Sequence, residues 1–388
     1  MKWMKYKKIG DLTNVITGGT PSTAKPEYWD NGDIPWLQSG CCQNCDVDFA
    51  EKYITQEGYD NSSTKLMPKD SVMIALTGAT AGKIGYLNFE ACGNQSITGI
   101  LPCELMNQRY LFYFLLSQRE KILADCIGGA QPHISQGYVK NIHVPVFPLE
   151  KQKEIVDTLS CLSGIINKRR NEIRLLDNLI KARFVEMFGD PVINEKDWPT
   201  KPLLDMGQCK NGMNFHYDDE GVEINCLGVG DFKDFSVINN TDELPKISLK
   251  EMPSEEYLLK DDDIVFVRSN GNKALVGRSI AVYPGDIPTT FSGFCIRYRK
   301  HDNEITVPYL LRVLKADSMR VKMTGRGANI QNLNQQILRT LVIPVPPIEL
   351  QDQFADFVHQ VDKSKVAVQK ALDETKLLFD SLMQKYFG

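Results

Sequence analysis

Two long stretches of the chain carry apolar residues in alternating steps of four and three. The first begins at Ile155 and the second begins 199 residues later, at Phe354, with the same order of steps. This spacing lines apolar side chains along one stripe of a helix and is typical of a coiled coil. The predicted seam consists of Ile155, Leu159, Leu162, Ile166, Ile173, Leu176, Ile180 and Met187 in the first stretch, and of Phe354, Val358, Val361, Val368, Leu372, Phe379, Leu382 and Tyr386 in the second.

We expect the two helices to cover each other's stripes, because neither can bury its own. The alternative is two unrelated surface helices. In an antiparallel pair the charged seam positions find partners, since Arg169 can reach Asp373 and Lys365 can reach Asp177. Antiparallel pairing is a hypothesis that would place two globular domains at opposite ends, related by a pseudo-twofold axis. Parallel pairing would put both domains at one end.

The segments that precede the two helices follow the same order of elements. In each, two short apolar runs flank a turn rich in Gly or Asn, and an amphipathic helix follows. The predicted elements are strands at Ser71–Leu76 and Ile84–Leu87 with a helix from Tyr110 to Ala124, and strands at Asp263–Val267 and Arg278–Val282 with a helix from Tyr309 to Met323.

The joins between these segments and the helices are also alike. Pro145–Gln152 and Pro344–Gln351 share the pattern Pro-x-x-Pro-x-Glu-x-Gln. A repeat of about 200 residues indicates a duplicated domain. We therefore predict an α+β fold with two mixed α/β domains and two long antiparallel helices. The predicted division is a first domain at 1–148, a first helix at 149–189, a linker and second domain at 190–347, and a second helix at 348–388.

Charge is distributed unevenly along the chain. The net charge of −4 by itself argues against a nucleic-acid partner. From Asp197 to Asp262, however, 6 Lys and Arg face 15 Asp and Glu, a net of −9, whereas from Asp263 to Val345 the counts are 12 and 5, a net of +7. Segregated charge can build a basic face on an acidic protein, although an ordinary solvated surface explains it about as well.

Several familiar kinds of chemistry are missing from the sequence. Thr77–Ile84 has three residues between its glycines and an Ile after its lysine, so it is not a phosphate loop. Cys42 and Cys45 have no second Cys pair nearby for zinc. We find no run of 18 apolar residues and no export signal, which favours a cytoplasmic protein with reduced cysteines and no membrane partner. The combined absences favour a binding protein over an enzyme.

A duplicated domain with two long spacer helices resembles the specificity (S) subunit of type I restriction–modification systems. The proline-rich joins resemble the start of that family's spacer helices, and the similarity covers the whole chain. The stretches that resemble its first target-recognition domain are Thr17–Thr23, Glu27–Trp29, Gly32–Trp36, Gly82–Gly85 and Asn94–Gln95. The second domain departs from this pattern, because Lys210–Phe215 stands in place of the Gly-Gly-Thr-Pro loop and Gly277–Arg278 in place of Gly82–Lys83.

The resemblance implies a sequence-specific DNA-binding subunit without catalytic residues. Each target-recognition domain of the family reads one half of a split site in double-stranded DNA. The partners implied are two methyltransferase (M) subunits and, in the full complex, restriction (R) subunits. S-adenosylmethionine, ATP and Mg²⁺ belong to those partners. Two other readings stay open, namely a scaffold that binds only proteins and a stand-alone DNA-modifying enzyme.

Candidate DNA contacts are Lys and Arg for phosphates, and amides and hydroxyls in loops for base edges. Ordinary turn chemistry is the alternative explanation for each of them. Arg268, Lys273 and Arg278 are the strongest group, because they share one strand–turn–strand segment. The full set is Thr20, Ser22, Lys25, Lys83, Gln95 and Ser96 in the first domain, and Lys210, Asn211, Arg268, Asn270, Asn272, Lys273, Arg278, Arg326, Asn329 and Gln331 in the second.

Overall fold

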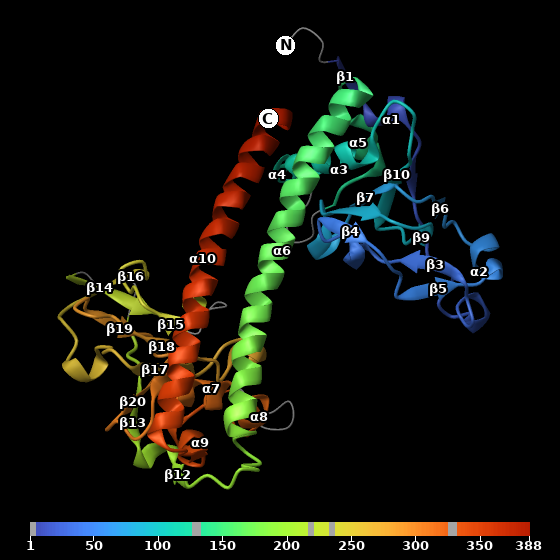
Figure 1. Cartoon of the computed structure of the whole chain (residues 1–388). Coiled ribbons are helices and arrows are strands. Elements are labelled where there is room, and N and C mark those ends of the chain that lie inside the picture. Colours follow the sequence, from blue (N-terminus) through green and yellow to red (C-terminus); the bar gives the residue numbers. More distant parts are fainter. Residues whose placement is uncertain (1–4, 126–132, 216–220, 233–236, 325–331) are drawn as a thin grey trace. The chain divides into compact units, whose positions relative to one another are not determined.

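The computed structural model describes residues 5–125, 133–215, 221–232, 237–324 and 332–388. The chain divides into two compact units. Unit 1 is Met1–Arg170 with Lys370–Gly388, and unit 2 is Asn171–Gln369. Each unit therefore combines a sheet-rich part with a piece of both long helices, which are the green and red ribbons of Figure 1.

The two long helices repeat each other in length and position. Helix α6 spans Leu149–Phe188 and α10 spans Ile348–Phe387, 40 residues each. Both bounds of α10 are those of α6 plus 199, the offset that the seam pattern predicts. Every predicted seam residue is buried or half-buried.

The helix segments run antiparallel within each unit. In unit 2, the rings of Phe184 and Phe354 lie 5.6 Å apart, and Lys365 Nζ donates to Asp177 Oδ1 at 2.6 Å. In unit 1, Arg169 donates to the Ala371 carbonyl and to the Thr375 hydroxyl. Numbers thus rise along one helix as they fall along the other. The predicted antiparallel pairing is confirmed, and so is the Lys365–Asp177 ion pair.

Unit 1 holds two sheets and a short strand pair. The five-stranded sheet has the order β2-β10-β7-β8-β4, the four-stranded sheet the order β5-β3-β9-β6, and β1 pairs with β11. Helix α3 packs against β7 and β8. The elements are β1 (Lys5–Lys8), α1 (Ile9–Leu12), β2 (Val15–Thr17), β3 (Ile34–Leu37), β4 (Cys45–Val47), β5 (Lys52–Ile54), α2 (Gln56–Asp60), β6 (Leu66–Met67), β7 (Val72–Ala75), β8 (Ile84–Leu87), β9 (Ala91–Gly93), β10 (Ile97–Ile100), α3 (Gln108–Ser117), α4 (Arg119–Ala124), α5 (Gln136–Asn141) and β11 (His143–Val146).

Unit 2 repeats this plan. Its five-stranded sheet has the order β13-β20-β17-β18-β15, a three-stranded sheet has the order β16-β14-β19, and β12 pairs with β21. The elements are β12 (Thr200–Pro202), β13 (Gly207–Asn211), β14 (Val222–Leu227), β15 (Val237–Ile238), β16 (Lys246–Leu249), β17 (Asp263–Val267), β18 (Ser279–Val282), β19 (Thr289–Phe291), β20 (Cys295–Lys300), α7 (Val307–Lys315), α8 (Asp317–Thr324), α9 (Gln335–Arg339) and β21 (Val342–Pro344).

The single helix expected after each sheet is two helices in the structure. Helix α3 ends and α4 begins around Gln118, whose ψ of 2° departs from helical geometry. In unit 2 the break is sharper, because Ala316 adopts extended backbone with ψ of 138° between α7 and α8. Apolar periodicity continues across both breaks, which is why the pattern alone predicts one helix.

Each unit needs residues from both long helices to complete its core. In unit 2, Phe184 and Phe188 of α6 pack with Phe354 of α10 and Tyr309 of α7, with ring centroids 4.8 to 5.7 Å apart. In unit 1, Ile155 and Leu159 of α6 share a core with Met383 and Phe387 of α10. Neither sheet-rich part closes its core without the helix pair.

A buried glutamine fixes the start of each long helix to the fold. Gln351 Oε1 accepts from the Thr306 N–H at 2.9 Å, and its Nε2 donates to the carbonyls of Pro346 and Glu304 at 2.9 and 3.1 Å. Gln152 makes the equivalent bonds in unit 1, with the Asn107 N–H as donor at 2.8 Å. These glutamines are the last residues of the shared Pro-x-x-Pro-x-Glu-x-Gln joins. The motif therefore has a structural role, because its glutamine links the first turn of each long helix to the neighbouring backbone by hydrogen bonds.

Replacing Gln351 by Ala should destabilise unit 2 by about 2 kcal/mol, because a buried N–H and two carbonyls lose their partner. Urea unfolding of the chain measures this loss. Gln353→Ala is the matched control, since Gln353 is exposed one half-turn further along α10. Equal stability of the two variants would contradict the structural role of Gln351.

Candidate nucleic-acid interface

In unit 1, a glycine loop packs against the turn that joins β9 to β10. The Gly18 N–H donates to the Ile97 carbonyl at 3.1 Å, and the Gly19 N–H donates to the Gly93 carbonyl at 2.9 Å. A Cβ on Gly18 would lie 2.0 Å from the Gly93 carbonyl oxygen, so this approach requires glycine. Trp36 adds a bond from its Nε1 to the Gly19 carbonyl at 2.9 Å.

This packing brings several predicted contact residues together. Thr20 donates its hydroxyl proton to Gln95 Oε1, and Thr77 Oγ1 donates to Ser96 Oγ at 2.8 Å. Thr20, Gln95 and Ser96 therefore lie beside the start of the turn that leads to Lys83. Lys83 Nζ donates to Gln43 Oε1 at 2.6 Å.

Lys25 and Ser22 belong to the next part of the same loop. Lys25 Nζ donates to Tyr28 Oη at 2.8 Å, and this hydrogen bond raises the pKa of Lys25. The Ser22 carbonyl accepts from Trp29 Nε1 at 3.1 Å, and the Ser22 side chain is exposed.

Unit 2 builds the same junction from different residues. The Gly212 N–H donates to the Cys295 carbonyl at 3.0 Å, and a Cβ on Gly212 would lie 2.0 Å from the Ser292 carbonyl oxygen. Gly212 and Met213, which follow β13, thus occupy the places of Gly18 and Gly19. The turn Ser292–Phe294 is equivalent to Asn94–Ser96, because each is fixed by the same backbone hydrogen bonds.

The strongest predicted group flanks this turn. The Arg268 N–H donates to the Phe294 carbonyl at 2.8 Å, and Arg268 Nη1 donates to the Gly293 carbonyl at 3.2 Å. Arg278 has the place of Lys83, since the Gly277 and Gly82 N–H groups before them make equivalent bonds to Val267 and Ala75.

The two predicted asparagines of this segment order the turn between Arg268 and Arg278. Asn270 Oδ1 accepts from the Asn272 N–H at 2.7 Å, and Asn272 Oδ1 accepts from the Ala274 N–H at 3.1 Å. The turn is therefore structured by its own side chains, as turn chemistry predicts.

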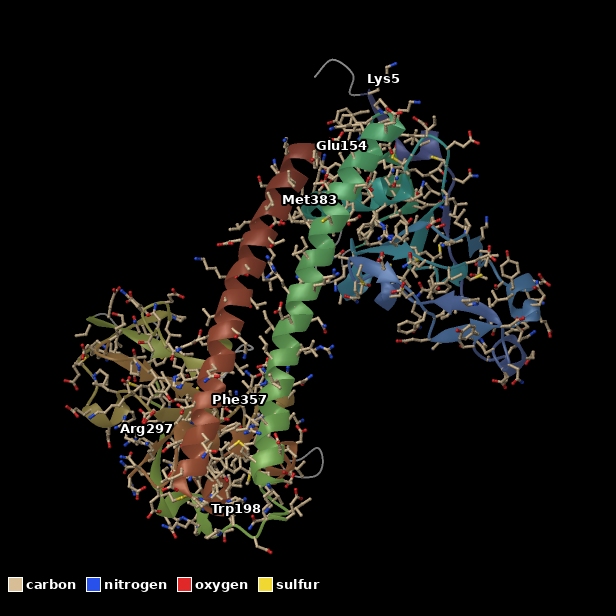
Figure 2. The ribbon with its side chains drawn as sticks, viewed as in Figure 1. Lys5, Glu154, Trp198, Arg297, Phe357 and Met383 are labelled. Carbon is tan, nitrogen blue, oxygen red and sulfur yellow. The ribbon has the colours of Figure 1, made fainter. Side chains whose placement is uncertain are left out.

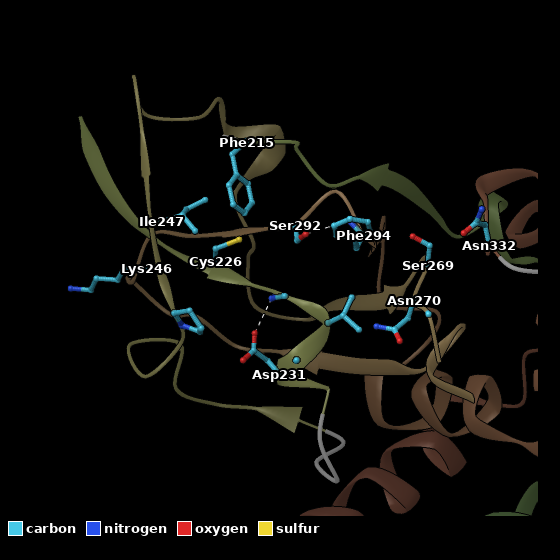
Figure 3. A pocket seen from close by; sticks show the side chains of 15 residues that line it. Phe215, Cys226, Asp231, Lys246, Ile247, Ser269, Asn270, Ser292, Phe294 and Asn332 are labelled. Carbon is cyan, nitrogen blue, oxygen red and sulfur yellow. Dashed lines mark hydrogen bonds between the residues drawn. The ribbon is translucent and has the colours of Figure 1, made fainter. Parts of the chain in front are cut away.

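A cavity of about 840 Å³ opens where these segments of unit 2 meet. Figure 3 shows Asn270 and Ser269 with Phe294 on one part of the wall and Phe215 with Cys226 on another. Asp231 Oδ2 accepts from the Gly228 N–H at 2.8 Å at the cavity's edge. Hydroxyl, amide and aromatic groups thus converge on one concave surface.

Lys210 and Asn211 lie on β13 and are already partnered. Lys210 Nζ lies 2.8 Å from Glu256 Oε2 and 4.5 Å from the Tyr257 ring centroid. The hydrogen bond that Lys210 donates to Glu256 raises the pKa of Lys210. Asn211 Oδ1 accepts from Gln335 Nε2 at 3.3 Å. Both predictions of DNA contact stay predictions.

Four predicted contacts lie outside what the structure describes. Arg326, Asn329 and Gln331 belong to the stretch 325–331, and the side chain of Lys273 is also outside the described part.

Among the described residues, several basic groups of unit 2 are buried or paired with carboxylates of the same unit. Arg297, labelled in Figure 2, is buried, which lowers its pKa. Arg299 pairs with buried Asp263 at 2.7 Å and Lys300 with Asp262 at 3.3 Å. Counting charges along the sequence assumes that all of these side chains lie on the surface. In the structure, some of the basic side chains instead form ion pairs with carboxylates of the same unit.

Other features limit the chemistry available. Nine cysteines in the described ranges are free thiols. Within those ranges no cluster of His, Cys, Asp and Glu could hold a metal ion. No helix in the part of the chain that the structure describes is long and apolar enough to cross a membrane.

Comparison with known families shows that both copies of the repeat match the same domain family. A sequence model of the type I restriction modification DNA specificity domain matches residues 1–175 and again residues 195–375. The chain belongs to this family. The two matches coincide with the two copies of the repeat.

Several relatives match this chain over almost its whole length. The type I restriction enzyme MjaIX specificity subunit of Methanocaldococcus jannaschii is 24% identical, over 98% of this chain and 91% of that protein. The EcoKI specificity subunit of Escherichia coli is 21% identical, over 98% and 87%. The fold is similar to that of the type I S subunit from M. genitalium, with a TM-score of 0.58 and 18% identity over 99% of this chain and 96% of that one.

Sequence reasoning missed some residues of the two surfaces. Gln43 of unit 1 and Phe294 of unit 2 lie in short loops that contain no Lys or Arg, so the basic signal used for prediction is missing there. Aligning the copies by their β9–β10 and β19–β20 turns would have paired Ser96 with Phe294. The signal was available in the repeat, but the intervening turns differ in length.

The single variants Lys83→Ala and Arg278→Ala should both bind DNA more weakly in the assembled complex. The loss of affinity in each should be about the same for all DNA sequences. Loss of one phosphate contact should reduce the slope of log affinity against log salt by about 1. Affinity measured across a salt series tests this. Lys385→Ala, at an exposed lysine of α10, is the control, and an unchanged slope in both variants would remove these residues from the interface.

Proposed function

We propose that this chain is the non-catalytic specificity subunit of a type I restriction–modification complex and that it reads a two-part DNA target. The observation that carries the proposal is that the family match occurs twice and that each match contains an equivalent set of convergent loops. In this proposal unit 1 reads one half-site and unit 2 reads the other.

The loops of the two units share their backbone frame but not their side chains. Thr20, Gln95 and Ser96 line the junction in unit 1, whereas Phe294 and Asn270 line it in unit 2. Base readout depends on the side chains that reach groove edges. Different side chains on a common frame support two different half-sites.

The proposed partners are double-stranded DNA, two methyltransferase subunits and, in the complete complex, restriction subunits. Methyl transfer from S-adenosylmethionine to adenine would occur on the methyltransferases. ATP and Mg²⁺ would serve the restriction subunits, and this chain would hold none of the three cofactors.

Each long helix exposes a leucine at the same repeat position. Leu179 of α6 is 47% exposed and Leu378 of α10, 199 residues later, is 51% exposed. An apolar side chain presented twice in one structural context suits two copies of one partner. We assign these leucines to docking of the two methyltransferase subunits.

Leu179→Lys and Leu378→Lys should each remove one methyltransferase subunit, because a charged side chain replaces apolar contact area. Native mass spectrometry of the co-purified complex should show one methyltransferase per chain for either variant and none for the double variant. Leu377→Lys, at a 71% exposed leucine without an apolar repeat mate, is the control. Two methyltransferases retained in both single variants would exclude this surface.

Co-expression with its methyltransferase, followed by mapping of methylated adenines in the host genome, tests the function as a whole. The expected result is methylation at one interrupted sequence. Methylation or cleavage by the purified chain alone would indicate a stand-alone enzyme. Absence of sequence-dependent DNA binding even with the methyltransferase present would indicate a protein scaffold.

A further inference from the structure

The two loop junctions differ at one turn position that is exposed in unit 2. Ser96 in unit 1 and Phe294 in unit 2 occupy equivalent positions, because the Leu76 and Arg268 N–H groups each donate to their carbonyls at 2.8 Å. The Ser96 hydroxyl accepts from Thr77, whereas Phe294 carries a ring that is 62% exposed.

The turn that carries Phe294 is held from several sides. The Phe294 N–H donates to Ser292 Oγ at 3.3 Å, and the Cys295 N–H donates to the Ser292 carbonyl at 2.8 Å. Arg268 donates to the carbonyls of Gly293 and Phe294. A Cβ on Gly293 would lie 2.1 Å from Asn214 Oδ1, so the neighbouring loop covers the turn closely.

The fold uses the backbone of Phe294 and leaves most of its ring in solvent. An exposed aromatic side chain contributes little to the stability of the folded chain, because such a residue stabilises a fold through burial of its apolar surface. The same ring fixed in advance loses little conformational entropy on binding. This combination is expected of a residue selected for contact with a partner.

The neighbours of Phe294 indicate what that partner presents. Ser269, Asn270 and Asn332 line the same cavity and offer hydroxyl and amide groups (Figure 3). Such groups pair with base edges, and the C5-methyl of thymine is the apolar group on the major-groove edge of base pairs. A ring beside polar readers is therefore matched to a thymine.

We propose that Phe294 is a specificity-determining residue that recognises a thymine in the half-site read by unit 2, by packing against its C5-methyl group. The inference rests on the proposed function of the chain. It predicts that one base pair of this half-site is read through a methyl contact, and that Ser96 makes no such contact in the other half-site.

Deoxyuridine substitution tests the inference, because uracil differs from thymine in DNA only by the missing methyl. The complex with its methyltransferases is bound to duplexes that carry its mapped target, with each thymine of both strands replaced in turn. One replacement in the second half-site should weaken binding about fourfold, the value for one buried methyl. Phe294→Ala should lose this sensitivity at that position, and Phe294→Leu should keep part of it.

Phe49→Ala is the matched control, since Phe49 is a 71% exposed phenylalanine of unit 1. It should keep the wild-type response to deoxyuridine in the second half-site. Equal binding of thymine and uracil duplexes by wild-type complex would overturn the inference while leaving the proposed function intact. A Phe294→Ala loss that is equal for specific and unrelated DNA would also overturn it. Failure of the wild-type complex to bind any sequence selectively would instead refute the proposed function.

Discussion

The structure depends on one constraint, which is that neither sheet-rich part can bury its core alone. Unit 2 closes on Phe184 and Phe188 from α6 and Phe354 from α10, and unit 1 closes on Ile155 from α6 and Phe387 from α10. Apolar burial is the dominant favourable term in folding. In each unit the helices are therefore held by the shared core as well as by the seam between them. A buried glutamine in the first turn of each helix adds hydrogen bonds to the neighbouring backbone.

That constraint explains how two different loop surfaces can share one scaffold. The buried glutamines, the buried tyrosines Tyr110 and Tyr309, and the glycine approaches at Gly18 and Gly212 are equivalent in both units. Ser96 and Phe294 project from equivalent positions of this frame, but their side chains differ in kind.

Periodicity predicted the long helices and their seam because burial of a helix stripe repeats every three or four residues. It joined α3 with α4, and α7 with α8, because apolar spacing continues through the break at Ala316. The loop junctions were only partly predictable. Gly18 and Lys83 were recognisable by residue type, whereas Phe294 is neither glycine nor basic and is identified by its alignment with Ser96. Charge counts along the sequence were less informative, because Arg297 is buried and Arg299 forms an ion pair with Asp263 of the same unit.

Phosphate ethylation interference on the complex of this chain with its methyltransferases tests the central claim most directly. Two equivalent reading surfaces predict two separate clusters of phosphates whose ethylation blocks binding. Lys83→Ala should weaken interference in one cluster only, and Arg278→Ala in the other only. One continuous cluster, or an effect of both substitutions on the same phosphates, would contradict the assignment of one half-site to each unit.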